Sequence, residues 1–312
     1  MEPGDRVGDY TLTRVVGQGS RATVWDAYRD DPTERVAVKL LDAADPTARK
    51  RLRAEYTEQS QLDHPNIVRA YELIEDEGRL ALVSELVDGG DMRAYIDQHA
   101  PSRSDALKVF AGILHGLGAA HAAGLVHRDL KPTNILMTEG PLSIPKIADF
   151  GVVKRTDKES LKLTQQGVVI GTLRYMSPEQ LMDASSVDAR ADLFSAGCIL
   201  FELLTHQKCF NASHRVALVN AVRTGDHTPY PDDLDPNLRA VIDALISAEP
   251  DGRPASAQEV LARLQLPLVH TPDLAVPLHT EDEPVDRNVV IAAGLGIVAL
   301  VLALGLVAYL LM

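Results

Sequence analysis

The stretch that decides the fold is His127-Arg128-Asp129-Leu130-Lys131-Pro132-Thr133-Asn134. Two shorter motifs follow it along the chain, first Asp149-Phe150-Gly151 and then Ser177-Pro178-Glu179. Each motif combines ionisable side chains with Gly or Pro, and such a set seldom occurs by chance in this order and at this spacing. We therefore interpret the three motifs as parts of one functional site.

A glycine-rich stretch and a lysine precede these motifs. Gly17 to Val24 reads Gly-Gln-Gly-Ser-Arg-Ala-Thr-Val between two predicted strands, and glycines there allow a backbone to approach phosphate oxygens closely. The stretch is not a Walker A loop, because no Gly-Lys-Ser/Thr follows and no helix begins after it. Lys39 ends the apolar run Val36-Ala37-Val38-Lys39, where a buried ammonium is costly without an anion.

Together these residues resemble the motifs of eukaryotic-like (Hanks-type) serine/threonine protein kinases, over about residues 8 to 266. The Ala-rich composition and the segment Thr172 to Gln180 are more similar to bacterial membrane kinases than to animal receptors. The resemblance implies an α+β, bilobal fold. Its β-rich N-lobe would cover about residues 8–86 and its helical C-lobe about residues 87–266.

Hydrophobic periodicity agrees with this division. Strands are predicted at Tyr10–Val16, Ala22–Tyr28, Arg35–Leu41, Val68–Ile74 and Arg79–Leu86, the last two as a hairpin. Helices are predicted at Pro46–Leu62, Ala106–Ala123 and Asp192–Leu204.

The resemblance implies transfer of the ATP γ-phosphate to Ser or Thr hydroxyls of protein substrates. Asp129 would accept the hydroxyl proton, and Lys131 would offset charge on the transferred phosphate. Thr172 would bond Asp129 and Lys131 and shape the acceptor site. Asn134 and Asp149 would hold Mg²⁺, or Mn²⁺ as an alternative, because amide and carboxylate oxygens suit a hard cation. Lys131 and Thr172 also indicate a serine/threonine rather than a tyrosine kinase.

The implied nucleotide contacts come from both lobes. Lys39 would hold the α- and β-phosphates, and Glu55 would orient Lys39, although Glu55 alone could also be a solvated helix charge. Asp192 resembles the aspartate that supports the catalytic loop, and Arg253 the arginine that pairs with Glu179. The remaining contacts fall into three groups. The phosphate loop would consist of Val16, Gly17, Gln18, Gly19 and Ser20. The adenine walls would be Val24, Ala37 and Leu136, and the hinge contacts would be Glu85 and Val87.

Several positions depart from the family pattern or remain open. Ala22 replaces the third glycine of the loop, and Ser84 replaces a bulkier residue before the hinge, which predicts a deeper back pocket. Gln59 stands where an apolar side chain is expected; it could weaken the active position of its helix, or its amide could find a partner. Asp91 fits either a ribose or substrate contact or a solvated charge.

Arg128 precedes Asp129 and leaves a cation in need of an anion. Phosphorylation between Asp149 and Glu179 would supply that anion and order the segment. Its distance from Gly171-Thr172 makes Thr164 the first candidate, with Ser160 and Thr156 as alternatives. We therefore expect autophosphorylation in this segment.

Composition excludes other classes of function. The chain has 31 Lys and Arg against 44 Asp and Glu, a formal charge of −13, which disfavours nucleic-acid binding. Its two cysteines, Cys198 and Cys209, are too few for a disulfide framework or a zinc site and suit a reducing compartment. The polar N-terminus is not a secretory signal.

The C-terminal part predicts a membrane tether. Residues 289–312 carry no charge, and 24 residues at ~1.5 Å each would form a helix of ~36 Å, enough to cross a bilayer, although a buried core helix is the alternative. Residues 267–288, rich in Pro and acidic side chains, would form a flexible linker. We expect a single-pass membrane protein with a cytoplasmic kinase domain and its C-terminus on the far side. The small-residue spacing of Ala292 and Gly296 is compatible with a homodimer.

Two other readings remain open. A pseudokinase scaffold would bind partners without turnover, but decay of this kind usually removes at least one of Lys39, Asp129, Asn134 and Asp149, all of which are present. A soluble kinase could instead dock its hydrophobic tail on another protein.

Overall fold

A computed structural model describes residues 1–19, 22–41, 45–76, 78–140, 143–150, 170–182 and 187–266 of the 312-residue chain. These residues all lie within one unit, Met1–Leu268. No helix in this part of the chain is both long and apolar enough to cross a membrane. Several predictions lie outside the described residues, namely the contact of Ser20, the phosphorylation sites Thr156, Ser160 and Thr164, the linker 267–288 and the membrane span 289–312.

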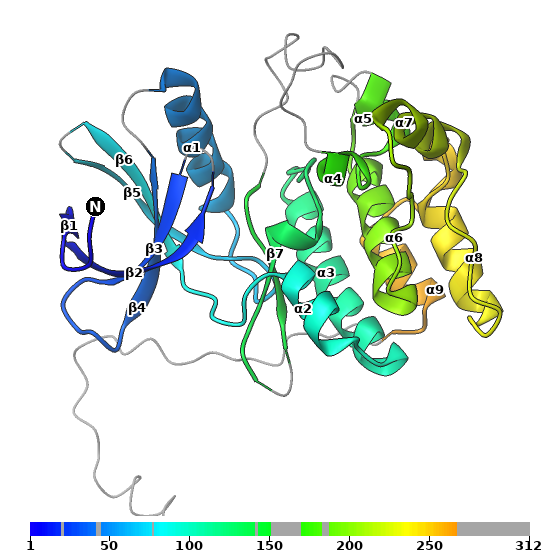
Figure 1. The fold of residues 1–312 in the computed structure, drawn as a ribbon, viewed down its shortest axis with the longest axis horizontal. Coiled ribbons are helices and arrows are strands. Elements are labelled where there is room, and N and C mark those ends of the chain that lie inside the picture. Colours follow the sequence, from blue (N-terminus) through cyan, green and yellow to red (C-terminus); the bar gives the residue numbers. More distant parts are fainter. Residues whose placement is uncertain are drawn as a thin grey trace, which may run out of the picture. The chain divides into compact units, whose positions relative to one another are not determined.

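The N-terminal lobe is an antiparallel sheet with one helix beside it (Figure 1). Among the described residues the sheet has six strands in the order β1-β2-β3-β4-β6-β5. β3 and β4 have the predicted bounds, whereas β2 continues two residues further and β1 was not predicted. The bounds are β1 Arg6–Val7, β2 Tyr10–Gln18, β3 Ala22–Tyr28, β4 Arg35–Leu41, α1 Pro46–Gln59, β5 Ala70–Asp76 and β6 Arg79–Glu85.

Side chains alternate between the two faces of this sheet along each strand, and apolar residues cover both faces. Trp25 and Val38 belong to one apolar cluster. Leu41 and Leu80 belong to a second cluster, which includes Leu52 of α1. α1 therefore packs its apolar side against the sheet.

Polar contacts fix where α1 begins and how it lies. The carboxylate of Asp45 caps the helix by accepting hydrogen bonds from the N–H groups of Thr47 and Ala48, at 2.9 and 3.2 Å. Arg49 and Arg53 both form ion pairs with Glu75 of β5. These contacts hold α1 against the sheet, and Glu55 lies on its next turn.

The C-terminal lobe is helical (Figure 1). α3 and α6 form its centre, where Phe110, Leu114, Phe194 and Phe201 are fully buried. They begin three and two residues before the predicted starts. The bounds are α2 Met92–His99, α3 Arg103–Ala122, η1 Pro132–Asn134, β7 Ile135–Met137, β8 Pro145–Ile147, α4 Ile170–Leu173, α5 Pro178–Met182, α6 Arg190–Thr205, α7 Arg215–Thr224, α8 Pro236–Leu245, η4 Pro250–Gly252 and α9 Ala257–Arg263.

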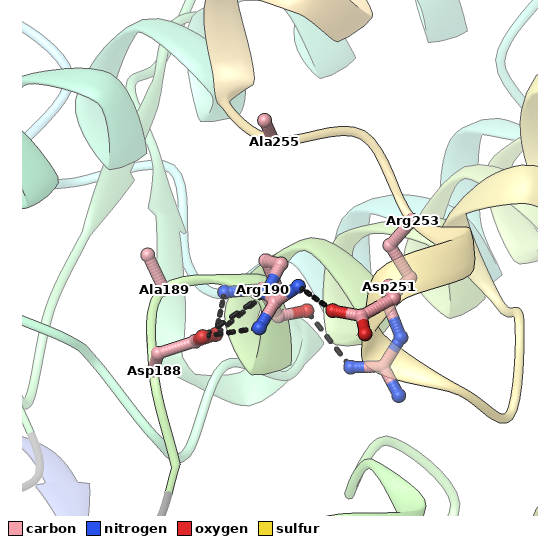
Figure 2. Close-up of a pocket in the computed structure, with 6 residues that line it drawn as sticks. All are labelled: Asp188, Ala189, Arg190, Asp251, Arg253 and Ala255. Carbon is pink, nitrogen blue, oxygen red and sulfur yellow. Dashed lines mark hydrogen bonds and ion pairs between the residues drawn. The ribbon is translucent and has the colours of Figure 1, made fainter.

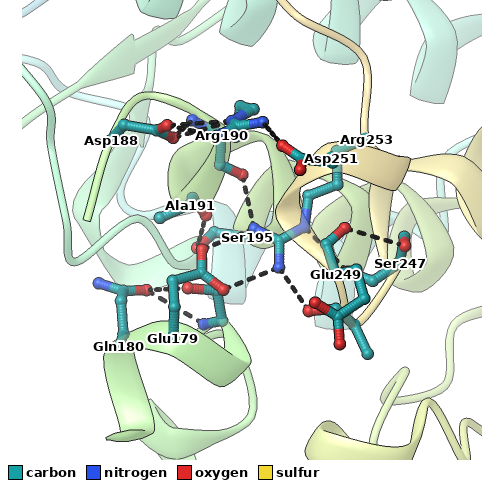
Figure 3. A network of polar contacts seen from close by, with 12 residues as sticks. Glu179, Gln180, Asp188, Arg190, Ala191, Ser195, Ser247, Glu249, Asp251 and Arg253 are labelled. Atoms are coloured by element: carbon teal, nitrogen blue, oxygen red, sulfur yellow. Dashed lines mark hydrogen bonds and ion pairs between the residues drawn. The ribbon is translucent and has the colours of Figure 1, made fainter. Parts of the chain in front are cut away.

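A buried arginine ties three segments of this lobe together (Figure 3). Arg253 donates to both carboxylate oxygens of Glu179, at 2.7 and 2.8 Å, which confirms the predicted pair. Its guanidinium also donates to the carbonyl oxygens of Arg190 and Ser247 and lies 5.0 Å from the centre of the Phe194 ring. The Ser-Pro-Glu motif is thereby anchored to α6 and to the segment before α9.

A cavity of about 390 Å³ lies beside this network (Figure 2). Arg190 extends along it, with ion pairs to Asp188 at 2.8 Å and to Asp251 at 2.7 Å. None of the predicted catalytic or nucleotide-binding residues lines this cavity, so it is separate from the site described below.

Arg253 and Arg190 should contribute very differently to stability. The Arg253 side chain is 0% exposed, and Arg253→Met leaves the Glu179 carboxylate without its cation, so we expect a loss of about 3–5 kcal/mol in the free energy of unfolding. Arg190→Gln removes only pairs to exposed carboxylates and should cost less than about 1 kcal/mol per pair. Urea unfolding of both variants measures this, and equal losses would contradict the assignment.

Candidate functional site

A buried carboxylate of α6 binds the backbone of the catalytic loop. Asp192 accepts hydrogen bonds from the backbone N–H groups of His127 and Arg128, both at 2.8 Å. Its Oδ2 also lies 2.9 Å from Nε2 of His121, a partner that the sequence did not indicate. Asp192 thus supports the loop as predicted, and Arg128 takes a left-handed backbone conformation with φ of 65°.

His127 connects this loop to the Asp149-Phe150-Gly151 motif. Its Nδ1 accepts a hydrogen bond from the N–H of Asp129 at 3.2 Å, so Nε2 carries the proton and donates to the Ala148 carbonyl at 2.9 Å. The imidazole also packs on the Phe150 ring, with centroids 4.9 Å apart. His127 therefore joins the two motifs directly.

Asp129 lies beside the two other polar side chains of its loop. Nζ of Lys131 is 2.9 Å from Oδ2 of Asp129. Nδ2 of Asn134 donates to the carbonyl oxygen of Asp129 at 2.8 Å. Because the amide nitrogen is used in this way, the carbonyl oxygen of the Asn134 side chain is the atom left for another ligand.

One ammonium group joins the two lobes. Nζ of Lys39 on β4 lies 2.8 Å from the carboxylate of Glu55 on α1 and 2.6 Å from the carboxylate of Asp149. The Lys39–Glu55 pair is the one that the position of Glu55 predicted. Asp149 has a φ of 57°, a strained conformation for a residue with a side chain, so its surroundings hold its carboxylate at this position.

Two carboxylates compete for this single ammonium. Burial raises the pKa of the Glu55 carboxyl to about 7, against the opposing effect of Lys39 and with a further rise from Asp149. For Asp149, burial acts in the same upward direction, but Lys39 outweighs it and lowers the pKa. Lys39 lies 2.6 Å from Asp149 and 2.8 Å from Glu55, and Glu55 is the carboxylate that retains a proton more readily.

Asn134 and Asp149 are a suitable donor set for Mg²⁺. The backbone N–H of Ala148 donates to the carbonyl of Asn134 at 2.9 Å, which brings the two predicted ligands onto adjoining segments. In the described part of the chain no cluster of three or more His, Cys, Asp or Glu could hold a metal. A site with one carboxylate and one amide fits Mg²⁺, which commonly takes its other ligands from phosphates and water.

The predicted adenine walls lie on neighbouring strands. Val24 pairs with Gly17 across β2 and β3 and with Lys39 across β3 and β4. Ala37 pairs with Ser84 of β6, which ends at the hinge residue Glu85. The end of β2 meets the start of β3 where the Gly19 N–H donates to the Ala22 carbonyl at 2.9 Å.

Part of the hinge backbone is available to hydrogen-bond a ligand. The Glu85 carboxylate is engaged by Lys146 at 2.8 Å, and the Glu85 N–H donates to the Arg69 carbonyl. The backbone of Val87, by contrast, has no hydrogen-bond partner among the described residues. Leu136 lies in β7, the strand of the lower lobe that follows the catalytic loop.

Two polar residues have contacts that decide between the alternatives, and a third lacks the contacts expected of it. The amide of Gln59 does find a partner, because its Nε2 donates to the Val68 carbonyl at 2.6 Å, while its buried Oε1 has none in the described structure. Asp91 caps α2 by accepting from the Ala94 N–H at 2.8 Å. The expected hydrogen bonds from the Thr172 hydroxyl to Asp129 and Lys131 are absent among the described residues.

Gln180 is a contact that the sequence did not reveal. Its Oε1 accepts from the Ser177 N–H at 3.1 Å, and its Nε2 donates to the Arg128 carbonyl at 2.7 Å. The Ser-Pro-Glu segment is therefore bonded directly to the catalytic loop. The only signal in the sequence is its position immediately after Glu179.

The raised pKa of Glu55 predicts a pH-dependent stability. A carboxyl whose pKa is about 7 when folded and about 4.5 when unfolded contributes stability below pH 4.5 that is lost as the pH rises through 7. The free energy of unfolding of the wild type relative to Glu55→Gln should fall by up to about 3 kcal/mol across this window. Denaturant titrations from pH 4.5 to 8 measure the difference, and a flat difference would contradict it. Asp149 is ionised over this window, because Lys39 lowers the pKa of its carboxyl.

Comparisons with known proteins agree with this geometry. A family model described as "Protein kinase domain" matches residues 10–264. A probable serine/threonine-protein kinase of Streptomyces coelicolor is 36% identical over 83% of this chain and 40% of its own length. The kinases PknH and PknA of Mycobacterium tuberculosis are 33% and 35% identical, over 82% and 78% of this chain and 41% and 57% of their own lengths. The chain thus spans about half or less of these relatives. It belongs to the protein kinase family, among the serine/threonine kinases of the bacterial Hanks type.

Proposed function

We propose that this chain is a serine/threonine protein kinase that uses ATP and Mg²⁺. The observation that supports this most strongly is the meeting of Lys39, Glu55 and Asp149 from three separate elements within hydrogen-bonding distance. Asp129 and Asn134 lie on the adjoining loop. A cation, a proposed metal-binding pair and a carboxylate base are therefore available on adjoining segments.

Each of these side chains has a defined task in the proposal. Bound ATP and Mg²⁺ supply the phosphoryl group and neutralise its charge. Lys39 binds phosphate oxygens and is oriented by Glu55. Asp129 orients the Ser or Thr hydroxyl and accepts its proton, and Lys131, 2.9 Å from Asp129, places positive charge beside the acceptor. Val16, Gly17, Gln18 and Gly19 contact the nucleotide from the upper lobe.

The pseudokinase alternative is less well supported. All four chemically necessary groups are present, and Lys39 and Asp149 are in contact rather than separated. Nothing in the described geometry requires Asp129 to be displaced before it can contact an acceptor.

We further propose that the chain phosphorylates itself between Asp149 and Glu179. Nε of Arg128 is buried and has no hydrogen-bond partner among the described residues, which is costly unless an anion arrives. A phosphate on Thr164, or on Ser160 or Thr156, would supply that anion.

The proposal also includes the domain boundaries and the tether. The kinase domain would span residues 8–266, followed by the linker 267–288 and a membrane helix at 289–312 that leaves the kinase domain in the cytoplasm. Pairing of two copies through this helix is compatible with its small residues. The support is the uncharged 24-residue composition of the segment.

Asp129→Asn should abolish transfer, because an amide cannot accept the hydroxyl proton. With Mg²⁺ and labelled ATP, the wild type should label myelin basic protein and itself, and the variant should lose at least about 10²-fold in rate. Nucleotide binding should persist in the variant, since Asp129 does not contact the nucleotide in this proposal. Equal labelling by both proteins, or by neither, would refute the assignment.

Membrane attachment should depend on residues beyond 280. The full chain should float with vesicles in a density gradient and require detergent for extraction, whereas a chain ending at Thr280 should remain in the aqueous fraction. A full chain that stays soluble without detergent, or that is extracted by high salt alone, would instead favour docking of the tail on a protein.

A further inference from the structure

The hinge is attached to the lower lobe at its first residue. Nζ of Lys146 on β8 lies 2.8 Å from the carboxylate of Glu85. In the pairing of β7 with β8, Lys146 stands directly opposite Leu136, the residue predicted to lie under the adenine. The hinge therefore begins at the level of Leu136.

A second attachment holds the chain where the hinge ends. The Gly89 N–H donates to the Met137 carbonyl at 2.9 Å, and the Met137 N–H donates to the Gly90 carbonyl at 2.8 Å. Beside these bonds Asp91 forms an antiparallel bridge with Leu136. The chain after the hinge thus pairs with the end of β7 as strands pair in a sheet. We call this pairing of residues 88–91 with residues 136–139 the hinge ladder.

Only glycine fits at position 89 of the hinge ladder. A methyl group on Gly89 would lie 2.4 Å from the Met137 carbonyl oxygen and 2.8 Å from the carbonyl carbon of Thr138. Both atoms belong to the backbone, so no side chain can turn aside to make room. Because non-bonded heavy atoms in favourable contact lie ~3.5 Å apart, a side chain at this position would push the two segments apart by ~1 Å.

The neighbouring glycine shows that this requirement is one of space. Gly90 has a φ of 75°, which favours glycine, but a methyl group there would meet no atom within 4 Å. Gly89 is not among the residues with positive φ, so an alanine could adopt its backbone conformation. Gly89 is therefore needed for the close approach of two backbones.

Three residues lie between the two attachments, namely Leu86, Val87 and Asp88. A base whose edge bonds to the backbone of Val87 and whose face rests on Leu136 needs these two residues at one particular separation. Because both ends of the hinge are attached beside Leu136, that separation is set before a ligand arrives. Such preorganisation lowers the entropic cost of binding.

We propose that Gly89 is a positioning residue for the adenine ring, a role that rests on the proposed use of ATP. Its missing side chain lets the hinge lie close enough to β7 for one base to contact both Val87 and Leu136. The role concerns the base alone, because the proposed function assigns the phosphates and Mg²⁺ to groups that include Lys39 and Asp149.

Kinetics of Gly89→Ala in the full chain test this role. The KM for ATP should rise about tenfold, because a gap of about 0.5–1 Å already removes a quarter to a half of the dispersion energy of a contact. The kcat and the KM for myelin basic protein should change less than about twofold. Gly225→Ala is the control for lost stability alone, because Gly225 caps the C-terminus of α7 with a φ of 72° and should leave the KM for ATP unchanged.

Binding of the separate parts of the nucleotide distinguishes the base from the phosphates. Adenosine lacks phosphates, and inorganic tripolyphosphate with Mg²⁺ lacks the base; each is measured by its displacement of a fluorescent ATP analogue. Gly89→Ala should weaken adenosine binding about tenfold and tripolyphosphate binding by less than about twofold. Equal adenosine binding by the variant and the wild type would overturn the proposal, and so would an equal loss of both ligands.

A second variant decides the outcome if thermal unfolding shows that Gly89→Ala does not fold. At the end of the hinge ladder, Oδ1 of Asp88 accepts a hydrogen bond from the Glu139 N–H at 3.0 Å. Asp88→Ala loosens the ladder without adding bulk, so it should weaken adenosine binding about threefold and leave tripolyphosphate binding unchanged. Unchanged adenosine binding in this variant would contradict the positioning role. A wild type that binds neither adenosine nor ATP would instead refute the proposed function, and the role of Gly89 with it.

Discussion

The sharing of one ammonium by two carboxylates is the constraint on which the site depends. Lys39 lies in a strand, Glu55 in a helix and Asp149 in the loop after β8, and only a structure that brings all three together avoids leaving a buried charge alone. One cation cannot fully satisfy two anions. Glu55 therefore retains affinity for a proton, and Asp149 remains the more exposed and more ionised carboxylate, which suits the metal-binding role proposed for it.

The surrounding structure explains how these groups keep their places. Arg49 and Arg53 hold α1, and thus Glu55, against β5 through Glu75. In the lower lobe Asp192 fixes the backbone of the catalytic loop, and His127 connects that loop to Phe150. Arg128 and Asp149 keep their strained backbone conformations because several of these contacts together fix the segments in which they lie. Rigidity at the site is therefore built by buried polar contacts as much as by the apolar core.

The sequence predicted those features that depend on local pattern or on a motif. Strand alternation gave β3 and β4 their bounds, and the counted positions of Glu55 and Arg253 led to pairs that the structure contains. It did not predict the bond from Gln180 to the Arg128 carbonyl or that from Gln59 to the Val68 carbonyl, because both join a side chain to a backbone group brought near only by tertiary folding. The hydrogen bonds expected from Thr172 to Asp129 and Lys131 are absent among the described residues, and they too depend on how one segment lies against another.

Charge distribution separates the two kinds of cation in this protein. Those that organise the site, such as Lys39 and Arg253, are compensated by buried carboxylates, and their removal would leave an unpaired charge. Arg190, by contrast, pairs with Asp188 and Asp251, whose carboxylates are exposed, so its removal leaves no buried charge. The buried pairs therefore fix the positions of the segments that they join, and the exposed pairs contribute little.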